Sequence, residues 1–444
     1  MQKYSTYKPS NVEWLGDVPT NWKVDKLKNY CDIFASNVDK KIEEGEIEVS
    51  LCNYVDVYKN EKIDRSIDFM IASATQAEIE KFTLQLNDII LTKDSETPDD
   101  IAVPAIVKEV FQNFLCGYHL SIIRCQKKIE PDFLIWALRD LHIATQFHRE
   151  AVGITRFGLA SKHFKNGIFA IPSRAEQTAI ATYLEQATAN IDKVIATKQK
   201  QLEKLEQYKQ SKIHECVTKG LNPDITLKPS GIDWIGDVPE HWKVERLKYV
   251  VSKIGSGVTP KGGAAVYLTT GIPLIRSQNV HFDGLDFSDI ACITEEIHDD
   301  MSGSKVKRGD VLLNITGASI GRCYYYDLDD EANVNQHVCI LRPNDLMTTN
   351  FLYYLMMSEV GQSQIFSGFK GSGREGLGNE AIKVFKIPLP KTKEQREISD
   401  YLDFFCDNIK KEKSIIEQQI EKLKQYRKCL IHECVTGKRK VVND

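Results

Sequence analysis

The chain has 444 residues, of which 42% are hydrophobic and 27% are charged, so it is expected to form two to four domains. It has no apolar run of about 18 residues and no apolar N-terminal segment, which argues against a membrane protein and a signal peptide; its eleven cysteines lack paired spacing and indicate reduced thiols in the cytoplasm. The net charge of −4 argues against a protein that coats DNA without sequence preference.

The first predicted element is a block over residues 1–170, and its opening string returns in the second half of the chain. The string at 8–28, Lys-Pro-Ser followed by Gly-Asp-Val-Pro between two tryptophans, reappears at 228–248. Runs rich in branched residues, such as 101–107, predict strands, and the apolar spacing at 133–147 predicts a helix. We therefore expect an α+β block that mixes short strands with helices.

The second predicted element is a long helix over residues 171–221. Residues 175–218 contain neither proline nor glycine, and they follow Pro172, where a helix can begin but not extend backwards. The closing string of this helix, at 203–218, returns at 421–436. Two strings repeated at nearly one spacing predict a tandem of two halves, each a block followed by a long helix.

The third and fourth predicted elements are a second block over residues 222–386 and a second helix with a basic tail over 387–444. Residues 393–436 again lack proline and glycine, and they follow Pro390. Apolar residues recur in both helices at steps of three and four, which favours an antiparallel coiled coil with a block at each end and pseudo-two-fold symmetry. The predicted seam, which also serves partner docking, comprises Ile180, Leu184, Ile191, Leu202, Leu205, Ile398, Leu402, Ile409, Ile416, Ile420 and Leu423.

Patterns of catalytic residues are scarce. The sequence contains no phosphate-binding GxxxxGK[ST] and no HExxH, and the His-Glu-Cys triplets at 214–216 and 432–434 offer too few ligands for zinc, so no metal site is predicted. Residues 369–373 match the FxGxG with which methyltransferases hold S-adenosylmethionine, but no Asn/Asp-Pro-Pro-aromatic string for an extruded base accompanies them. A self-contained S-adenosylmethionine-dependent DNA methyltransferase and a protein-only coiled-coil adaptor stay open as alternatives.

Further strings in the second block carry a family resemblance. They are Gly-Ser-Gly-Val-Thr-Pro at 255–260, Ile-Arg-Ser-Gln-Asn-Val at 275–280 and Thr-Gly-Ala-Ser-Ile-Gly at 316–321. Together with the duplicated tryptophan string and the paired helices, they resemble the DNA specificity subunit of type I restriction–modification systems. The first block departs most from this pattern and carries Thr-Lys-Asp-Ser at 92–95 in place of the last string.

The resemblance implies a non-catalytic, cytoplasmic subunit with two target-recognition domains. Each domain would read one half of a bipartite, asymmetric target in double-stranded DNA, and the helices would set the gap between the halves. The helices would also dock two adenine-N6 methyltransferase subunits, which two restriction/translocase subunits would join in a complete system. The chain itself would bind no cofactor and no membrane, because S-adenosylmethionine, ATP and Mg²⁺ would belong to these partners.

The candidate DNA-binding residues are polar side chains in the strings and loops of the two blocks. Base edges in the major groove differ in donor and acceptor pattern, which Arg, Lys, Asn, Gln, Ser and Thr can match. Arg156 and Arg374 hold equivalent places in the two halves, so we expect them to contact the DNA backbone, whereas unmatched residues should specify bases. The candidates are Lys93, Ser95, Thr155, Arg156, Lys162, Arg276, Gln278, Asn279, Thr316, Ser319, Lys370, Ser372 and Arg374.

Overall fold

The computed structural model describes residues 3–368 and 376–441 of the chain. The chain divides into two compact units, of which the first combines Met1–Lys198 with Glu417–Asp444 and the second is Gln199–Ile416. Each unit therefore contains one sequence block together with part of each long helix. The sequence-based domain boundaries, which separate blocks from helices, stay a prediction.

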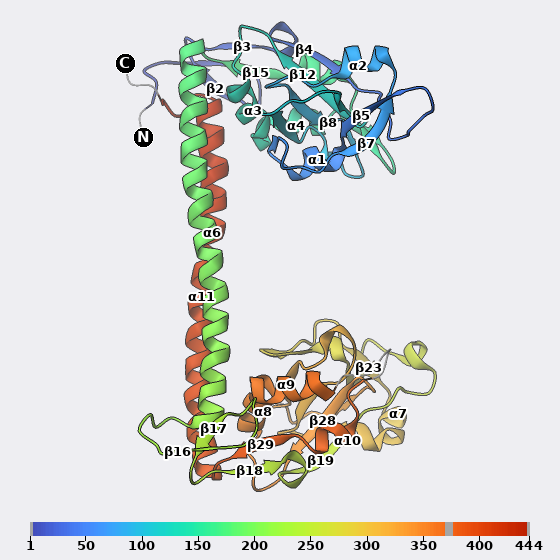
Figure 1. Ribbon diagram of the computed structural model, residues 1–444, viewed down its shortest axis with the longest axis vertical. Coiled ribbons are helices and arrows are strands. Elements are labelled where there is room, and N and C mark those ends of the chain that lie inside the picture. Colours follow the sequence, from blue (N-terminus) through green and yellow to red (C-terminus); the bar gives the residue numbers. More distant parts are fainter. Residues whose placement is uncertain (1–2, 369–375, 442–444) are drawn as a thin grey trace. The chain divides into compact units, whose positions relative to one another are not determined.

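The first block is built on a five-stranded sheet that positions the loops discussed below (Figure 1). The sheet order is β4-β12-β8-β10-β6, and all its pairings are antiparallel except β10 with β6. The strands of this unit are β1 (Tyr7–Pro9), β2 (Asp17–Pro19), β3 (Lys23–Lys26), β4 (Cys31–Ala35), β5 (Ile47–Cys52), β6 (Lys62–Ile63), β7 (Met70–Ala74), β8 (Ile89–Thr92), β9 (Asp94–Ser95), β10 (Pro104–Val107), β11 (Phe114–Cys116), β12 (Leu120–Cys125), β13 (Val152–Gly153), β14 (Phe157–Gly158) and β15 (Ile168–Ile171). Its short helices are α1 (Tyr54–Lys59), α2 (Gln76–Phe82), α3 (Pro131–Arg139), α4 (Leu141–His148) and α5 (Ser161–Asn166).

The second block repeats the central strands with fewer partners. Its sheet has the order β19-β28-β25-β26, and a second sheet has the order β23-β20-β27-β24. The strands are β16 (Leu227–Pro229), β17 (Asp237–Pro239), β18 (Lys243–Arg246), β19 (Val251–Ser256), β20 (Ile272–Ile275), β21 (Val280–His281), β22 (Gly284–Leu285), β23 (Ala291–Ile293), β24 (Lys305–Val306), β25 (Val311–Asn314), β26 (Cys323–Tyr325), β27 (Ala332–Val334), β28 (Val338–Pro343) and β29 (Lys386–Leu389). The short helices are α7 (Glu295–Asp300), α8 (Thr349–Met357), α9 (Glu359–Gly368) and α10 (Asn379–Lys383).

Buried polar contacts recur at equivalent places in the two blocks. Arg124 bonds both carboxylate oxygens of Asp88, at 2.9 and 2.6 Å, and Arg342 does the same with Asp310, at 2.7 and 2.7 Å. In both pairs the aspartate side chain is almost fully buried. A buried carboxylate needs such a partner because its unpaired charge would be strongly destabilising. The two pairs link the second strand of each sheet to the turn before the third strand. Both blocks therefore share one arrangement of these central strands, which is their common frame.

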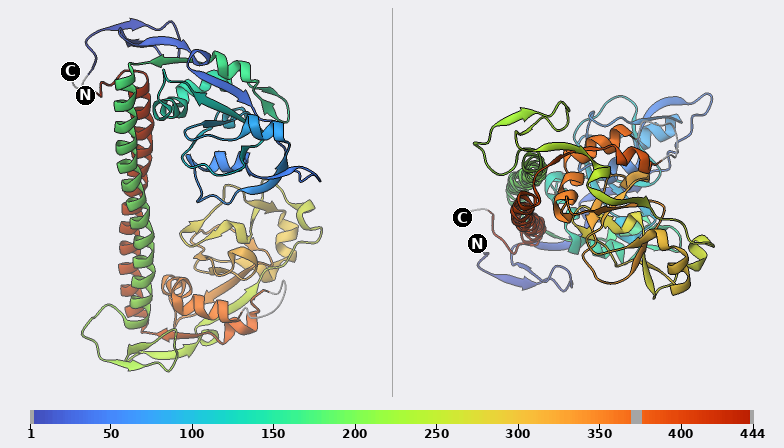
Figure 2. Two further views of the ribbon diagram at one scale, coloured as in Figure 1. Left: turned by 45° about the horizontal axis from the view of Figure 1, so that its top comes forward. Right: turned by 90° about the horizontal axis from the view of Figure 1, so that it is seen from below.

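The long helices are α6 (Arg174–Lys219) and α11 (Thr392–Val435), and their segments lie side by side within each unit (Figures 1 and 2). In the first unit Lys198 Nζ bonds Gln419 Oε1 at 2.6 Å, while Asp192 pairs with Arg427 at 3.1 Å. Because the residue numbers rise along one helix as they fall along the other, the pairing is antiparallel. The mixed helix–sheet blocks and the antiparallel helices confirm the predicted fold class.

The predicted seam residues face the interior of the paired helices. Ile180, Leu184, Ile191, Ile398, Leu402, Ile409 and Ile420 are buried, and Leu202, Leu205, Ile416 and Leu423 are half-buried. In the first unit Ile180 and Leu184 of α6 share one apolar core with Leu430 and Ile431 of α11 and with the block itself. The apolar stripe of each helix is therefore covered by the other helix and by a block, as helices of this composition require. In the described ranges, no helix has the length and apolar character needed to cross a membrane.

Candidate nucleic-acid interface

In the first block, two segments that are distant in the sequence meet beside the end of the central strand β8. The short strand β9 (Asp94–Ser95) pairs with β14, so that Ser95 lies opposite Phe157 and Asp94 opposite Gly158. Strand β14 in turn forms a hairpin with β13. The turn between these strands holds Ile154, which is 96% exposed, next to the exposed Thr155 and Arg156. The hairpin thus presents its tip to solvent while its base is anchored on β9.

Asp94, His119 and Arg156 form a polar cluster at the base of this hairpin. The Asp94 carboxylate accepts hydrogen bonds from Arg156 Nε at 3.0 Å and Nη2 at 2.7 Å, and His119 Nδ1 lies 2.6 Å from the same oxygen. Burial lowers the pKa of His119, while the nearby Asp94 acts in the opposite direction. The Arg156 side chain is half exposed, so its ion pair with Asp94 is weak and open to exchange for an external anion.

The other candidate DNA-binding residues of the first block differ in their exposure and in their hydrogen-bond partners. Lys93 is half-buried and donates from Nζ to the Ser36 carbonyl at 3.1 Å, and burial lowers its pKa. Ser95 is buried, with its hydroxyl 3.1 Å from that of Tyr54. Lys162 is exposed on α5, and within residues 3–368 and 376–441 its side chain has no hydrogen-bond or ion-pair partner. The structure thus brings Lys93, Ser95 and Arg156 together around β9 and leaves Lys162 free.

The second block carries a different side chain at the matching place. Thr316 follows β25 as Asp94 follows β8, and its hydroxyl lies 2.6 Å from Nδ1 of His337, the counterpart of His119. The backbone N–H of Leu377 bonds the carbonyl of Ile315 at 2.8 Å, just as Leu159 bonds Lys93. Of the remaining candidates here, Ser319 is half-buried, and Lys370, Ser372 and Arg374 lie outside the described residues.

The string around 276–279 folds into a turn held by its own polar groups. Asn279 is buried, and its amide accepts from the Arg276 N–H at 3.0 Å and donates to the carbonyls of Asp286 and Asp289. Arg276 donates from Nη2 to the Asp289 carbonyl at 2.9 Å, and Gln278 donates to the Asp289 carboxylate at 3.1 Å. Asn279 therefore shapes the turn, while Arg276 and Gln278 make contacts at the surface.

The family model for the type I restriction modification DNA specificity domain matches residues 19–207 and again residues 239–422. The chain belongs to this family. The two matches cover both blocks and most of both long helices, which agrees with the duplication found in the sequence.

Specificity subunits are similar to this chain, some over its whole length and others over part of it. The chain is 25% identical over 444 residues to the type I restriction enzyme MjaVIII specificity subunit of Methanocaldococcus jannaschii, with 98% of both chains covered. It is 27% identical over 265 residues to the EcoBI specificity subunit of Escherichia coli, covering 57% of this chain and 55% of that protein. Members of the family are non-catalytic specificity subunits, so this chain is not an enzyme by itself.

Solved structures share the fold. One is a chain of a type I R-M system, with a TM-score of 0.73, 16% identity and coverage of 94% of this chain and 98% of that chain. Another is the HsdS subunit from Thermoanaerobacter tengcongensis, with a TM-score of 0.55, 18% identity and coverage of 95% and 98%. At these identities the likeness concerns the fold alone.

Sequence reasoning on this specificity subunit missed two residues of the polar cluster and the histidine at the matching place in the second block. Asp94 and the histidines His119 and His337 were not candidates, although both histidines stand at equivalent places in otherwise diverged halves. A polar residue retained in both copies of a duplicated block is the signal that points to them. Asp94 could not be found this way, because its counterpart is Thr316.

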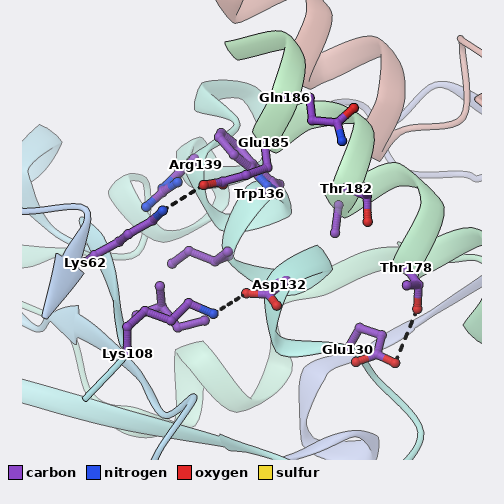
Figure 3. Close-up of a pocket in the computed structure, with 13 residues that line it drawn as sticks. Lys62, Lys108, Glu130, Asp132, Trp136, Arg139, Thr178, Thr182, Glu185 and Gln186 are labelled. Carbon is purple, nitrogen blue, oxygen red and sulfur yellow. Dashed lines mark hydrogen bonds and ion pairs between the residues drawn. The ribbon is translucent and has the colours of Figure 1, made fainter. Parts of the chain in front are cut away.

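A cavity of about 370 Å³ lies in the first unit between the block and α6 (Figure 3), and it contains none of the candidate DNA-binding residues. Two ion pairs lie within the lining, Lys62 with Glu185 at 2.7 Å and Lys108 with Asp132 at 2.6 Å, whereas Arg139 and Glu130 of the lining pair with Glu61 and Arg174 outside it. The Arg139 guanidinium lies 4.8 Å from the centroid of the Trp136 ring. This internally neutral lining favours a packing cleft over a site for a charged ligand.

Proposed function

We propose that each block of this specificity subunit reads one half of a bipartite target in double-stranded DNA. The observation that carries the proposal is the equivalent cluster beside β9 and after β25, where one frame presents different side chains. Asp94 stands against His119 in the first block and Thr316 against His337 in the second. Two copies of one frame with different polar groups at one place are suited to two different half-sites.

The chemistry of these groups fits the edges of base pairs. A carboxylate such as Asp94 accepts from the N4 amine of cytosine, whereas a threonine hydroxyl can donate or accept and offers a methyl group to thymine. Arg156 sits beside Asp94 on an exposed hairpin and can exchange that carboxylate for a phosphate. Lys93, Ser95, Thr155 and Lys162 complete the proposed surface of the first block.

The proposed DNA-binding surface of the second block includes residues within the described ranges and residues outside them. Arg276, Gln278, Thr316 and Ser319 are the proposed contacts within the described ranges, with Asn279 holding the turn that carries the first two. Lys370, Ser372 and Arg374 belong to the segment that joins α9 to Gly376 and remain proposed contacts on sequence grounds.

We further propose that the paired helices dock two methyltransferase subunits, one for each copy of the helix string. The tyrosine of this string is exposed in both copies, 53% for Tyr208 and 45% for Tyr426. In the second unit, Phe404 on α11 is 69% exposed. Exposed aromatic side chains on a rigid helix are typical anchors of protein interfaces. The methyltransferases would bring S-adenosylmethionine, and restriction subunits that join them would bring the use of ATP and Mg²⁺.

The test of DNA reading is methylome sequencing of cells that express the chain with its modification partner. We expect methyladenine in a bipartite sequence, and we expect Asp94→Thr to change the preferred bases in one half while leaving the other half unchanged. Arg156→Ala should weaken DNA binding by the partnered complex on all sequences and reduce the slope of log K against log salt by about one. Methylation of an undivided sequence, or an Asp94→Thr variant with an unchanged motif, would refute the proposal.

Partner docking is tested separately by measuring association with the methyltransferase subunit. Phe404→Ala should weaken association, whereas Tyr249→Ala should not, although Tyr249 is also an exposed aromatic residue of the second unit, at 55%. Equal affinities for both variants and the unmodified chain would exclude the helix face around Phe404 as the docking site.

A further inference from the structure

The C-terminal end of α11 meets the corner between α3 and α4 within the first unit. Asp140 ends α3 and caps α4, since one carboxylate oxygen accepts the N–H of Ile143 at 2.9 Å. Its other oxygen lies 3.1 Å from Nδ1 of His432 on α11. His142, in the first turn of α4, has its ring centroid 4.5 Å from that of His432. One carboxylate and two imidazoles thus converge from positions up to 292 residues apart.

The geometry of this cluster is close to that of a metal site. The ligand atoms of Asp140, His142 and His432 all lie within 4.8 Å of one another. A tetrahedral zinc ion with bonds of 2.0–2.2 Å holds its ligand atoms roughly 3.3 Å apart. The remaining approach can come from the exposed His142 ring, whereas Asp140 is buried and already fixed by its bond to α4. Because the Asp140 carboxylate is fixed, rotation of the His142 side chain is the movement needed to bring the three ligand atoms within bonding distance of one ion.

We propose that Asp140, His142 and His432 bind one divalent transition-metal ion of the zinc class, with water as the fourth ligand. Imidazole nitrogens and a carboxylate oxygen are the donors that Zn²⁺ accepts in sites with an open position. The bound ion links the end of α11 to the corner of the first block. No such site is predicted from the sequence, because only the fold brings Asp140 and His142 to His432.

Lys438 holds His432 in a hydrogen-bonded arrangement that competes with metal binding. Its Nζ lies 2.8 Å from Nε2 of His432, so the neutral ring carries its proton on Nδ1 and donates it to Asp140. A metal ion bound at Nδ1 moves that proton to Nε2, and Lys438 then has to turn away. Lys438 is exposed, so this movement is open to it. Removing the Lys438 ammonium should therefore strengthen metal binding.

The second unit offers an internal contrast. His214 holds the place of His432 in the repeated string, but Ser358 and Val360 stand where the first unit has Asp140 and His142. Both are fully buried, and His214 Nδ1 is buried without a hydrogen-bond partner within the described residues. His214 with Glu359 as its acidic neighbour offers too few ligands to hold an ion, so we expect one site per chain rather than two.

The experiment uses the metal-free full chain under reducing conditions, with Zn²⁺ titrated by calorimetry and Co²⁺ by absorption. We expect one equivalent to bind, and we expect His142→Gln to weaken binding by at least about tenfold. His142 is the variant of choice because its ring is exposed and the Asp140–His432 bond survives its replacement. His163→Gln, which removes another histidine from the first unit, is the control and should bind as the unmodified chain does.

Several outcomes would overturn the proposal. They are the absence of stoichiometric binding, equal affinity of His142→Gln and His163→Gln, and a thiolate charge-transfer band in the Co²⁺ spectrum, which would place the ion on cysteines. Lys438→Met should bind more tightly than the unmodified chain, and weaker binding would contradict the displacement of Lys438. Melting temperatures in the presence of a chelator show whether each variant is folded before metal is added.

Discussion

Gln395 fastens the start of α11 to the start of α8, and its replacement provides a quantitative test of the second unit. The side chain is fully buried. Its Oε1 accepts the backbone N–H of Thr348 at 2.8 Å, and its Nε2 donates to the carbonyls of Leu346 at 2.8 Å and Pro390 at 2.9 Å. Gln177 occupies the equivalent place in the first unit, where it accepts the N–H of Glu130 at 2.7 Å.

Gln395→Ala removes three hydrogen bonds and leaves their backbone partners without a protein partner. Each such bond contributes about 1 kcal/mol net, so the free energy of unfolding of the second unit should fall by about 3 kcal/mol. Gln177→Ala should cost somewhat less in the first unit, because its bond to the Lys128 carbonyl is 3.5 Å long. Gln201→Ala, an exposed position on α6 in the second unit, is the control and should change stability by no more than about 0.5 kcal/mol.

Urea denaturation followed by circular dichroism measures the free energies, and amide hydrogen exchange locates the change. In Gln395→Ala the Thr348 amide should exchange faster, while amides of the first unit keep their protection. A loss of stability below about 1 kcal/mol, equal to that of Gln201→Ala, would refute the reasoning, because it would mean that these buried bonds contribute nothing net.

Two further predictions concern charged groups of the second unit. Burial raises the pKa of Glu206, but hydrogen bonds from Lys209 and Lys413 outweigh the effect of burial and bring the pKa to about 2. The ionised carboxylate therefore stabilises the fold above about pH 4.5, and this stabilisation is lost as the pH falls towards 2. The difference in melting temperature between the unmodified chain and Glu206→Gln should therefore shrink over that range, and a difference that does not vary with pH would contradict this pairing. Asp310→Ala leaves the Arg342 guanidinium unpaired and should reduce the free energy of unfolding by about 3–5 kcal/mol in urea denaturation, more than any exposed charge substitution in the same unit.

The presence and approximate extent of the two long helices could be predicted from the sequence. The proline- and glycine-free run at 175–218 became α6 (Arg174–Lys219), and the run at 393–436 became α11 (Thr392–Val435). The reason is that helix ends depend on local signals, here Pro172 and Pro390 at the N-terminal sides. The seam residues were also predictable, because apolar spacing along one helix is a local property.

The hydrogen-bond partners of the polar side chains could not be predicted, because they depend on contacts between segments that are distant in the sequence. Asn279 lies in a family-like string, and its contact with DNA stays a prediction, but the turn that its amide shapes could not be predicted from that string. Gln395 looks like an ordinary solvent-facing residue in the first turn of a helix, but it is buried because α8 begins against it. Composition and spacing report which side chains can form hydrogen bonds, and only the folded chain determines which partners they find.

The division between buried and exposed polar groups explains how the two blocks can differ in what they read while keeping one frame. A buried pair such as Asp310 with Arg342 cannot change one member alone, because the other would remain as an unpaired buried charge. Asp94 and Thr316 stand beside matching histidines at the edge of that frame, and a threonine at position 94 could contact His119 as Thr316 contacts His337. It follows that the proposed reading surface can be altered while the frame is kept, and that Asp94→Thr should change the half-site read by the first block at a lower cost in stability than Asp310→Ala.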